Sequence, residues 1–384
     1  MSNMKVIAYL NKLCKQGVGR LAALDMLKEE LGIKHSQNEK YPDLYCLNYD
    51  QISSPKLHPI VRECRSLVLG VYGNTTKQGD YYEEFYVVSR SFDRFFNYQE
   101  VEETSNININ DLVAVEKVDG SLVSMFYYQD KWLYRTRSMI MPDEAMTING
   151  TKTTWHELID PFVGFMECFS ANISENNTYI FEVVSPHNRV VTRYDEPAAY
   201  FLGARENKTG KYVTKEVYLP LEISVPEFYT FKSMESCLSS AKSLPNLEEG
   251  YVMCTREGEP VMKVKSPAYV AAHRLRGETI LTGKRVMDMI FLNEQEEYLS
   301  IFPEDEDMFN TYLTALSRLK ADFEALWVKT KNIEDQKEFA LSVKDSRVSS
   351  LLFNKRKDNS LSFEDMFGKL FTSNKYKLIE GYVK

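Results

Sequence analysis

The chain has 384 residues, 43% of them hydrophobic and 27% charged, with a formal net charge of −8. This length allows one large and one smaller domain, and the lack of any run of about 18 apolar residues argues against a membrane-spanning segment. The acidic balance argues against a uniformly basic nucleic-acid-binding domain, although a basic groove can lie on an acidic protein. Six scattered cysteines without CxxC spacing predict reduced thiols and no zinc site.

The first segment, residues 4–31, has apolar residues at helical spacing. Gly17 and Gly19 interrupt this pattern, so we expect two short helices. The segment contains no apolar signal core, so we expect the protein to stay in the cytoplasm. The polar residues 35–40 and the following Pro42 predict a loop.

The middle of the chain, from about Tyr45 to Lys265, consists of short β-rich runs separated by turn residues. Such runs are typical of antiparallel sheets. A helix is expected near residues 154–168. The expected strands are residues 66–71, 84–88, 112–115, 122–128, 132–135, 179–184, 198–202, 251–255 and 261–264.

The last part of the chain, after about Ala268, has no strand pattern. Apolar residues recur every three or four positions from Phe309 to Trp327, which predicts a long amphipathic helix. Further helical patterns follow at residues 337–352 and 363–371. This part is therefore expected to be all-helical.

The change of pattern predicts a domain boundary. We expect an α+β domain over residues 1–267, with a helical N-terminal segment, and a helical C-terminal domain over residues 268–384. Two basic runs in the second domain, residues 355–357 and 375–377, suit either RNA contacts or solvated helix ends.

Several common phosphate-binding and catalytic motifs are missing from the sequence. It contains no GxxxxGK[ST], no GxGxxG after a strand and no GxSxG, which excludes a P-loop, a Rossmann site and a nucleophile elbow. A Lys-x-Asp-Gly string does occur at residues 117–120. Alone it is weak, because about one chain in ten of this length has one by chance, and a solvated surface turn would explain it.

Three further strings follow the first in order. They are Phe181–Val184, Glu249–Val252 and Lys263–Lys265, each on or beside an expected strand. Singly, each suits an ordinary strand-end carboxylate or a solvated strand face. Together, two carboxylates and a pair of lysines that share one strand face point to phosphate chemistry.

The ordered set resembles the covalent nucleotidyltransferase superfamily of ATP-dependent ligases and mRNA capping enzymes. Three further segments narrow the resemblance: Arg62–Arg65, residues 89–97 and residues 186–191. They narrow it to the RNA ligase 1 family, whose typical member is an enzyme of bacteriophage T4. The resemblance covers about residues 45–273. It implies an α+β fold in which an antiparallel-sheet nucleotidyltransferase domain, of the ATP-grasp-like ligase type, precedes an all-helical C-terminal domain.

The resemblance makes Lys117 the nucleophile that attacks the α-phosphorus of ATP, expels pyrophosphate and carries a covalent AMP. The attack needs a neutral amine, but about one lysine in a thousand is neutral near pH 7.4. We therefore expect the like charges of Lys263 and Lys265 to lower the pKa of Lys117. The same two lysines are expected to meet the charge that builds on the α-phosphoryl oxygens.

The resemblance also assigns the groups that would hold the nucleotide and a metal ion. Glu249 would bind Mg²⁺ or Mn²⁺, hard cations that prefer carboxylate oxygen. Glu182 would contact a ribose hydroxyl, and Arg65 the nucleotide and its phosphates. Arg94 replaces a family lysine and is expected at the outer phosphates. Glu116, next to the nucleophile, would complete the nucleotide site.

Residues around the nucleophile and in two later segments have less defined roles. Asp119 and Gly120 form the turn beside the nucleophile, and Asp119 is also expected to steer the amine or the metal. Arg137 stands where the family has a lysine and is expected to meet phosphate in later steps. Tyr269 and His273, one helical turn apart, match family positions near the RNA. Core packing is the alternative for Tyr269.

The activity implied is that of an ATP-dependent RNA ligase. It would join 5′-phosphate and 3′-hydroxyl RNA ends through a lysyl-AMP and an adenylylated RNA 5′ end. The expected setting is repair of tRNA broken in the anticodon loop, by a phage-encoded monomer in the host cytoplasm, with the helical domain tuning the preference for tRNA.

Two alternatives remain open. A DNA ligase or a capping guanylyltransferase would share the motif set, although those enzymes normally carry an OB domain where this chain has helices. A non-catalytic RNA-binding module of ligase-like fold would bind RNA without forming a nucleotide adduct.

Overall fold

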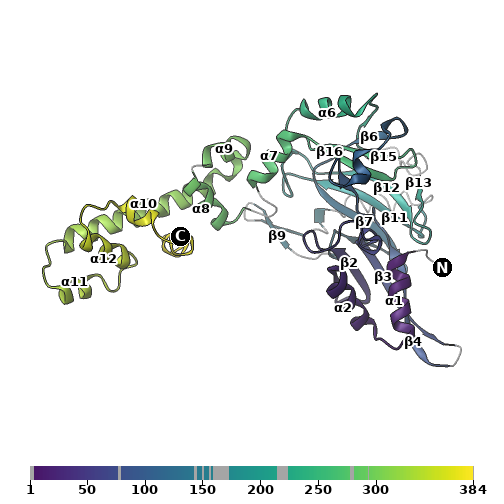
Figure 1. The fold of residues 1–384 in the computed structure, drawn as a ribbon, viewed down its shortest axis with the longest axis horizontal. Helices are drawn as coiled ribbons and strands as arrows, with labels where there is room; N and C mark the ends of the chain where they lie inside the picture. Colours follow the sequence, from purple (N-terminus) through teal and green to yellow (C-terminus); the bar gives the residue numbers. More distant parts are fainter. Residues whose placement is uncertain are drawn as a thin grey trace. The chain divides into compact units, whose positions relative to one another are not determined.

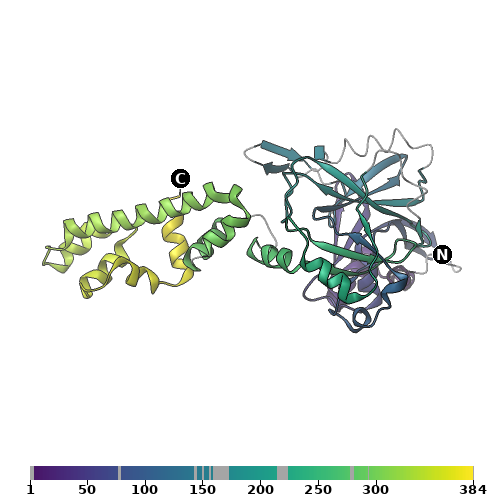
Figure 2. The ribbon, with the colours of Figure 1, turned by 90° about the horizontal axis from the view of Figure 1, so that it is seen from above.

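The computed structural model describes residues 4–76, 79–141, 145–148, 151–154, 157–158, 173–213, 224–276, 281–292 and 294–383. The chain divides into two compact units, Met1–Val270 and Ala271–Lys384. The first contains sheets whose strands are antiparallel except for the parallel pair of β5 (Phe96–Asn97) and β16 (Pro260–Lys265), together with helices. The described part of the second contains helices (Figures 1 and 2). The fold is therefore α+β, as predicted. The helix expected near residues 154–168 lies largely outside the described ranges.

The N-terminal part of the first unit contains two helices and a four-stranded sheet (Figure 1). The predicted pair of helices is confirmed, and Gly17 follows the first of them in the left-handed region, with a φ of 89°. The helices are α1 (Lys5–Lys15) and α2 (Arg20–Leu31), and the sheet order is β1 (Ile33–Asn38), β2 (Tyr41–Tyr49), β3 (Arg65–Thr75) and β4 (Tyr81–Ser89).

The loop predicted over residues 35–42 is wrong. Strands β1 and β2 run through it and pair from Ile33 with Tyr49 to Asn38 with Tyr41. Strand β1 lies at the edge of the sheet, and Ile33 is its one buried residue. An edge strand needs little apolar alternation, so the polar sequence concealed it.

Two five-stranded sheets form the rest of the core of the first unit, and every strand predicted from residue 66 onward is confirmed. One sheet has the order β13 (Tyr212–Val213), β12 (Ala198–Glu206), β11 (Asn177–Val184), β7 (Ser121–Tyr128) and β8 (Lys131–Arg135). The other has the order β14 (Phe228–Tyr229), β6 (Val113–Glu116), β15 (Gly250–Cys254), β16 (Pro260–Lys265) and β5 (Phe96–Asn97).

Shorter elements lie between these strands along the chain. They are α3 (Pro59–Glu63), α4 (Glu102–Ser105), the 3-10 helix η1 (Ile109–Asp111), the hairpin of β9 (Ala145–Ile148) and β10 (Thr151–Thr154), and α6 (Met234–Lys242). None of the described helices is long and apolar enough to cross a membrane. The five described cysteines are buried and free, as predicted.

The N-terminus of α1 is held by a residue from α3. The two carboxylate oxygens of Glu63 accept the backbone N–H groups of Lys5 and Val6 at 3.0 and 2.9 Å. The first N–H groups of a helix have no partner within the helix, and negative charge there is favourable. Glu63 therefore fastens α1 to the segment that leads into β3.

We expect Glu63→Gln to lower the free energy of unfolding by about 1 kcal/mol, because the amide accepts from only one of its two atoms and carries no charge. Urea unfolding followed by circular dichroism measures this. Glu29→Gln, on the exposed surface of α2, is the matched control and should leave the midpoint unchanged. Equal midpoints for the two variants would contradict the capping role.

The second unit is built from helices around its own apolar core. The helix predicted around residues 309–327 is confirmed as α10. The pattern at 337–352 forms two helices instead of one, the pattern at 363–371 forms α13, and α14 was not predicted. The helices are α7 (Pro267–Arg276, which crosses the division between the units), α8 (Gly283–Leu292), α9 (Gln295–Ile301), η4 (Pro303–Asp305), α10 (Glu306–Thr330), α11 (Gln336–Val343), α12 (Ser349–Lys357), α13 (Phe363–Gly368) and α14 (Thr372–Glu380).

The basic run at residues 355–357 closes loops of this unit. The Lys355 ammonium donates to the carbonyls of Asn359 and Leu361 at 2.7 and 2.6 Å. The Arg356 guanidinium stacks 4.4 Å from the Phe339 ring and donates to backbone carbonyls of the segment before α11. Both cations therefore serve the helical fold, which favours a helix-end role over RNA contact.

Candidate active site

The predicted nucleophile lies where β6 ends. The backbone N–H of Lys117 donates to the carbonyl of Gly250 at 2.8 Å, which ties the end of β6 to the start of β15. Gly250 has a φ of 133°, and a Cβ there would lie 2.1 Å from the Val264 carbonyl oxygen. A Cβ on Gly120 would lie 2.4 Å from the Val183 carbonyl oxygen. Only glycine allows the strands to approach the nucleophile this closely.

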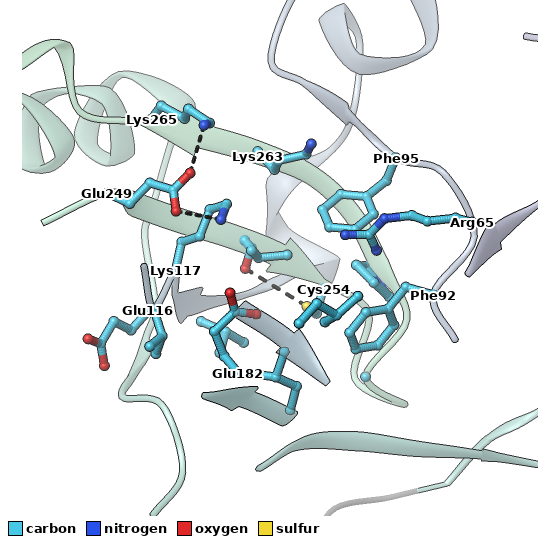
Figure 3. Close-up of a pocket in the computed structure, with 17 residues that line it drawn as sticks. Arg65, Phe92, Phe95, Glu116, Lys117, Glu182, Glu249, Cys254, Lys263 and Lys265 are labelled. Carbon is cyan, nitrogen blue, oxygen red and sulfur yellow. Dashed lines mark hydrogen bonds and ion pairs between the residues drawn. The ribbon is translucent and has the colours of Figure 1, made fainter. Parts of the chain in front are cut away.

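A buried carboxylate joins two of the predicted lysines. Glu249 is 4% exposed, and its Oε2 lies 2.5 Å from the Lys117 Nζ while its Oε1 lies 2.7 Å from the Lys265 Nζ. Figure 3 shows these three side chains pointing toward one another from neighbouring strands. The two ammonium groups are thus held side by side, separated by a single carboxylate.

The cavity beside this cluster contains most of the predicted site residues. It also contains aromatic and apolar residues to which the sequence assigned no role. Its lining is Arg65, Phe92, Phe95, Val115, Glu116, Lys117, Val118, Leu122, Glu182, Leu202, Glu249, Val252, Cys254, Gly258, Pro260, Lys263 and Lys265 (Figure 3).

The predicted lowering of the Lys117 pKa is wrong for the protein without nucleotide. Burial acts to lower the pKa, but the carboxylates of Glu249, Glu182 and Asp119 together outweigh burial and raise it. The lysine with a low pKa is Lys263. Burial, together with the positive charges of Arg65 and the neighbouring lysines, lowers the pKa of Lys263 to about 7.

The carboxylate of Glu182, on β11, also lines the cavity. Burial raises the pKa of Glu182 to about 7, and the nearby Lys117 opposes that rise. Among the described residues, no three metal-ligating side chains gather at one point. The carboxylate of Glu249 offers the oxygen ligands that Mg²⁺ and Mn²⁺ prefer.

Asp119 braces the nucleophile turn. Its Oδ2 accepts the backbone N–H groups of Val191 and Thr192 at 2.8 and 2.7 Å, and its Oδ1 accepts the Tyr269 hydroxyl at 2.6 Å. Both oxygens therefore bond groups that hold the turn, and the expected role of Asp119 in steering the amine or the metal stays a prediction. The signal for the bracing role was the string of residues 186–191, whose contact with Asp119 only the fold reveals.

Tyr269 lies beneath this arrangement. It is 2% exposed, and the Lys265 ammonium lies 5.2 Å from its ring. Because so little of the ring is accessible, we assign Tyr269 to the support of Asp119 and Lys265 rather than to RNA contact.

We expect Tyr269→Phe to lower the free energy of unfolding by about 1.5–3 kcal/mol, because it removes a hydrogen bond to a buried, charged acceptor. Tyr194→Phe is the comparison, since the Tyr194 hydroxyl accepts only the backbone N–H of Asp119, at 3.2 Å. Its loss should cost about 1 kcal/mol or less. Guanidinium unfolding of both variants measures the difference. Equal losses of unfolding free energy would show that the bond from Tyr269 to Asp119 is no stronger than an ordinary hydrogen bond.

Three predicted arginines gather around aromatic rings. The Arg65 guanidinium lies 5.1 Å from the Phe95 ring, and those of Arg94 and Arg137 lie 4.1 and 5.1 Å from the Tyr49 ring. Nη1 of Arg65 and Nη1 of Arg94 are buried and have no hydrogen-bond partner among the described residues. Buried donors of this kind suit a ligand that brings anionic oxygens.

The aromatic partners were missed by sequence reasoning. Phe95 contacts both Arg65 and Lys263, whose ammonium lies 4.9 Å from its ring. The segment 89–97 was recognised, but nothing in it distinguishes Phe95 from its neighbours. Tyr49, at the end of β2, had no signal at all, because its cations come from distant segments.

Two predicted residues lie apart from the cluster. The carboxylate of Glu116 points away from Lys117 (Figure 3) and accepts the backbone N–H of Glu227 at 3.1 Å. His273 belongs to the second compact unit, so no place in the cavity is assigned to it.

Comparison with known proteins gives one family match and several relatives. A model of the RNA ligase family of T4 RNA ligase 1 type matches residues 63–269. A protein of Autographa californica nuclear polyhedrosis virus, whose name joins a polynucleotide kinase to an RNA ligase, is 29% identical over 361 residues, 89% of this chain and 49% of the relative. An RNA ligase of Rhodothermus phage RM378 is 24% identical over 349 residues, 70% of this chain and 76% of the relative.

The chain thus spans about half the length of its baculovirus relative. Among solved structures, an archaeal ATP-dependent RNA ligase gives a TM-score of 0.45 at 13% identity, covering 90% of this chain and 80% of that one. A Naegleria gruberi RNA ligase mutant with ATP and Mn gives a TM-score of 0.39 at 12% identity, covering 63% of this chain and 97% of that one.

The family match spans more than half of the chain and includes the nucleophile turn, Glu182, Glu249 and both lysines of β16. The chain belongs to the RNA ligase family of T4 RNA ligase 1 type.

Proposed function

We propose that this protein is an ATP-dependent RNA ligase that acts through a lysyl-AMP on Lys117. The observation that carries the proposal is the buried Glu249 carboxylate, which holds the Lys117 and Lys265 ammonium groups 2.5 and 2.7 Å from its oxygens. Lys263 lines the same cavity. A nucleophilic amine therefore lies beside two cations that can meet a phosphoryl group in transfer.

The first step begins from a charged Lys117, because the nearby carboxylates, above all Glu249, raise its pKa. A divalent cation held by Glu249 and the phosphates of ATP would supply the positive charge that lowers this pKa. The neutral amine then attacks the α-phosphorus, the bond to the β-phosphate oxygen breaks, pyrophosphate leaves, and the amine releases its remaining extra proton to solvent.

The chain's own cations stabilise this transfer. Lys263 and Lys265 meet the charge on the α-phosphoryl oxygens. Arg65 and Arg94 receive the outer phosphates through buried donors that have no hydrogen-bond partner among the described residues. Arg137, beside Arg94 at the Tyr49 ring, receives a later RNA phosphate. Glu182, whose carboxylate lines the cavity, is proposed to accept a ribose hydroxyl. The apolar lining surrounds the adenine base.

The next two steps reuse the same groups. A 5′-phosphate oxygen of RNA attacks the AMP phosphorus and frees Lys117, and an RNA 3′-hydroxyl then attacks the activated 5′ end and releases AMP. We propose repair of broken RNA as the setting, with tRNA cut in the anticodon loop as the substrate. The name of the viral relative supports RNA repair as the setting, because a polynucleotide kinase makes the 5′-phosphate that such a ligase needs.

The test is to incubate the protein with ATP and Mg²⁺ or Mn²⁺, without RNA, and to measure the mass of the intact chain. We expect a gain of one AMP, located on Lys117 by peptide mapping, removed by pyrophosphate and discharged by 5′-phosphorylated RNA. An adduct with GTP instead would identify a capping guanylyltransferase, and sealing of nicked DNA alone a DNA ligase. No adduct with either nucleotide would overturn the catalytic proposal in favour of an RNA-binding module.

A further inference from the structure

A second cavity lies in the first unit, between α1 and the outer strand β4, which run side by side in Figure 1. Its rim includes Lys12 and Lys15 from the last turn of α1 and Lys208 from the turn after β12. Tyr72 of β3 and Tyr86 of β4 also line it. We call the cavity defined by these five residues the Tyr72 groove.

The Tyr72 groove carries net positive charge on an acidic protein. Lys12, Lys15 and Lys208 are exposed, and none of them forms an ion pair within the described part of the chain, whereas Lys34 and Lys56 in the same unit pair with Asp50 and Glu100. The carboxylate in its lining, Glu84, accepts the side-chain amide of Asn74 at 2.8 Å. Three cations therefore face a single, already bonded carboxylate.

The groove also presents an accessible aromatic surface. Tyr72 is 47% exposed, and its ring lies 5.6 Å from that of Tyr86, tilted by 47°. Exposed rings beside spaced cations are the combination that binds single-stranded nucleic acid, because bases stack on the rings and phosphates meet the cations. An acidic peptide would use the cations but would not need the rings.

The groove is close to the candidate active site along the chain. Tyr86 lies six residues before Phe92, which lines the nucleotide cavity. A chain of six residues spans at most about 20 Å. The Cα atoms of Tyr86 and Phe92 are therefore at most about 20 Å apart, a separation that a few nucleotides of extended RNA can span.

We propose that the Tyr72 groove binds a single-stranded segment of the RNA substrate, a few nucleotides from the end that reacts. This inference rests on the proposed function for the identity of the RNA. It adds a second contact that sets how tightly long substrates bind and leaves the chemistry at Lys117 unchanged. RNA substrates that are too short to reach the groove would bind no more tightly because of it.

The first test removes the charge of the groove. The triple variant Lys12→Gln, Lys15→Gln, Lys208→Gln is compared with the control triple Lys28→Gln, Lys131→Gln, Lys242→Gln. The control changes the net charge equally and removes exposed lysines from two helix ends and from the start of β8. Fluorescence anisotropy with labelled single-stranded RNA should show about tenfold weaker binding for the groove variant. Its slope of log affinity against log salt should fall by about 2, at about 0.7 per lost contact.

The second test removes the ring. Tyr72→Ala should weaken binding of long RNA by about fivefold to tenfold, and Tyr72→Phe should restore it, because stacking needs no hydroxyl. In ligation, both the alanine and the triple variant should raise KM for long RNA and leave KM for the shortest ligatable RNA unchanged.

Two outcomes overturn the groove proposal: RNA affinity of the groove variant equal to that of the control triple, or competition by a polyglutamate peptide as strong as by RNA. Formation of the lysyl-AMP, which needs no RNA, is measured in every variant. Its absence in the unaltered protein would refute the proposed function, and the anisotropy assay would still test the groove.

Discussion

Replacing Glu249 with glutamine should lower the rate of lysyl-AMP formation by about 10²–10³-fold. The carboxylate positions Lys117 and Lys265 through contacts of 2.5 and 2.7 Å. Glutamine would leave both ammonium groups beside a neutral amide with one donor end, and would remove the group proposed to hold the metal. Single-turnover labelling with radioactive ATP measures the rate directly.

The matched control is Glu248→Gln, one residue earlier and outside the cluster. Its labelling rate should stay within about twofold of the unaltered protein. The Glu249 variant should also unfold more easily, because removal of one partner from a buried ion pair leaves the other charges uncompensated. If Glu249→Gln labels at the normal rate, Lys117 is not positioned by Glu249 and the arrangement in Figure 3 is not the reactive one.

Replacing Lys263 with methionine should abolish most activity and yet stabilise the protein. The loss should be about 10²–10³-fold in lysyl-AMP formation, since one cation at the α-phosphoryl group is removed. At pH 6 the free energy of unfolding should rise by about 1–3 kcal/mol, because burying this charge is costly and methionine fills the same space without it.

The pH dependence of this gain has a defined sign. Folding lowers the pKa of Lys263 from its ordinary 10.5 to about 7, so the unfolded chain binds more protons between these values and the stability of the unaltered protein rises there. The cost of Lys263 is therefore complete below pH 7 and fades toward pH 10.5. The stabilisation by Lys263→Met should be largest at pH 6 and less than half as large at pH 9.5.

Lys265→Met supplies the contrast. Lys265 is paired with Glu249, so its removal should destabilise the protein at pH 6 instead of stabilising it. Urea unfolding of the three proteins at pH 6 and pH 9.5 measures all the differences. If Lys263→Met is destabilised, or if its gain in unfolding free energy is equal at pH 6 and pH 9.5, the pKa of Lys263 is not low in the folded protein.

Much of the nucleotidyltransferase fold could be predicted from the sequence because its strands are regular in composition. Runs such as residues 122–128 and 179–184 are buried in the middle of a sheet and carry the apolar and β-branched residues that such strands need. The polar β1 was missed, since only Ile33 of it is buried. Helix α14 was missed for a related reason, because Ile379 is its one buried residue.

The site residues could be selected because the motifs fall at strand ends, where the fold brings Lys117 and Glu249 together. The pKa shifts of these residues could not be predicted from the motifs. Counting lysines predicted a low pKa for Lys117, but the carboxylate at 2.5 Å reverses the direction. The aromatic partners Tyr49 and Phe95 follow no periodic pattern either, because cation–ring contacts depend on packing between remote segments.

The buried guanidinium donors of Arg65 and Arg94 have a practical consequence. These atoms have no hydrogen-bond partner among the described residues, so an anion from the solution can supply the acceptor oxygens. Ions that bind only the folded state shift the melting temperature by mass action. Phosphate, pyrophosphate or sulfate in a buffer should therefore stabilise the protein before any nucleotide is added, and melting temperatures of its variants become comparable only when the anion and its concentration are held constant.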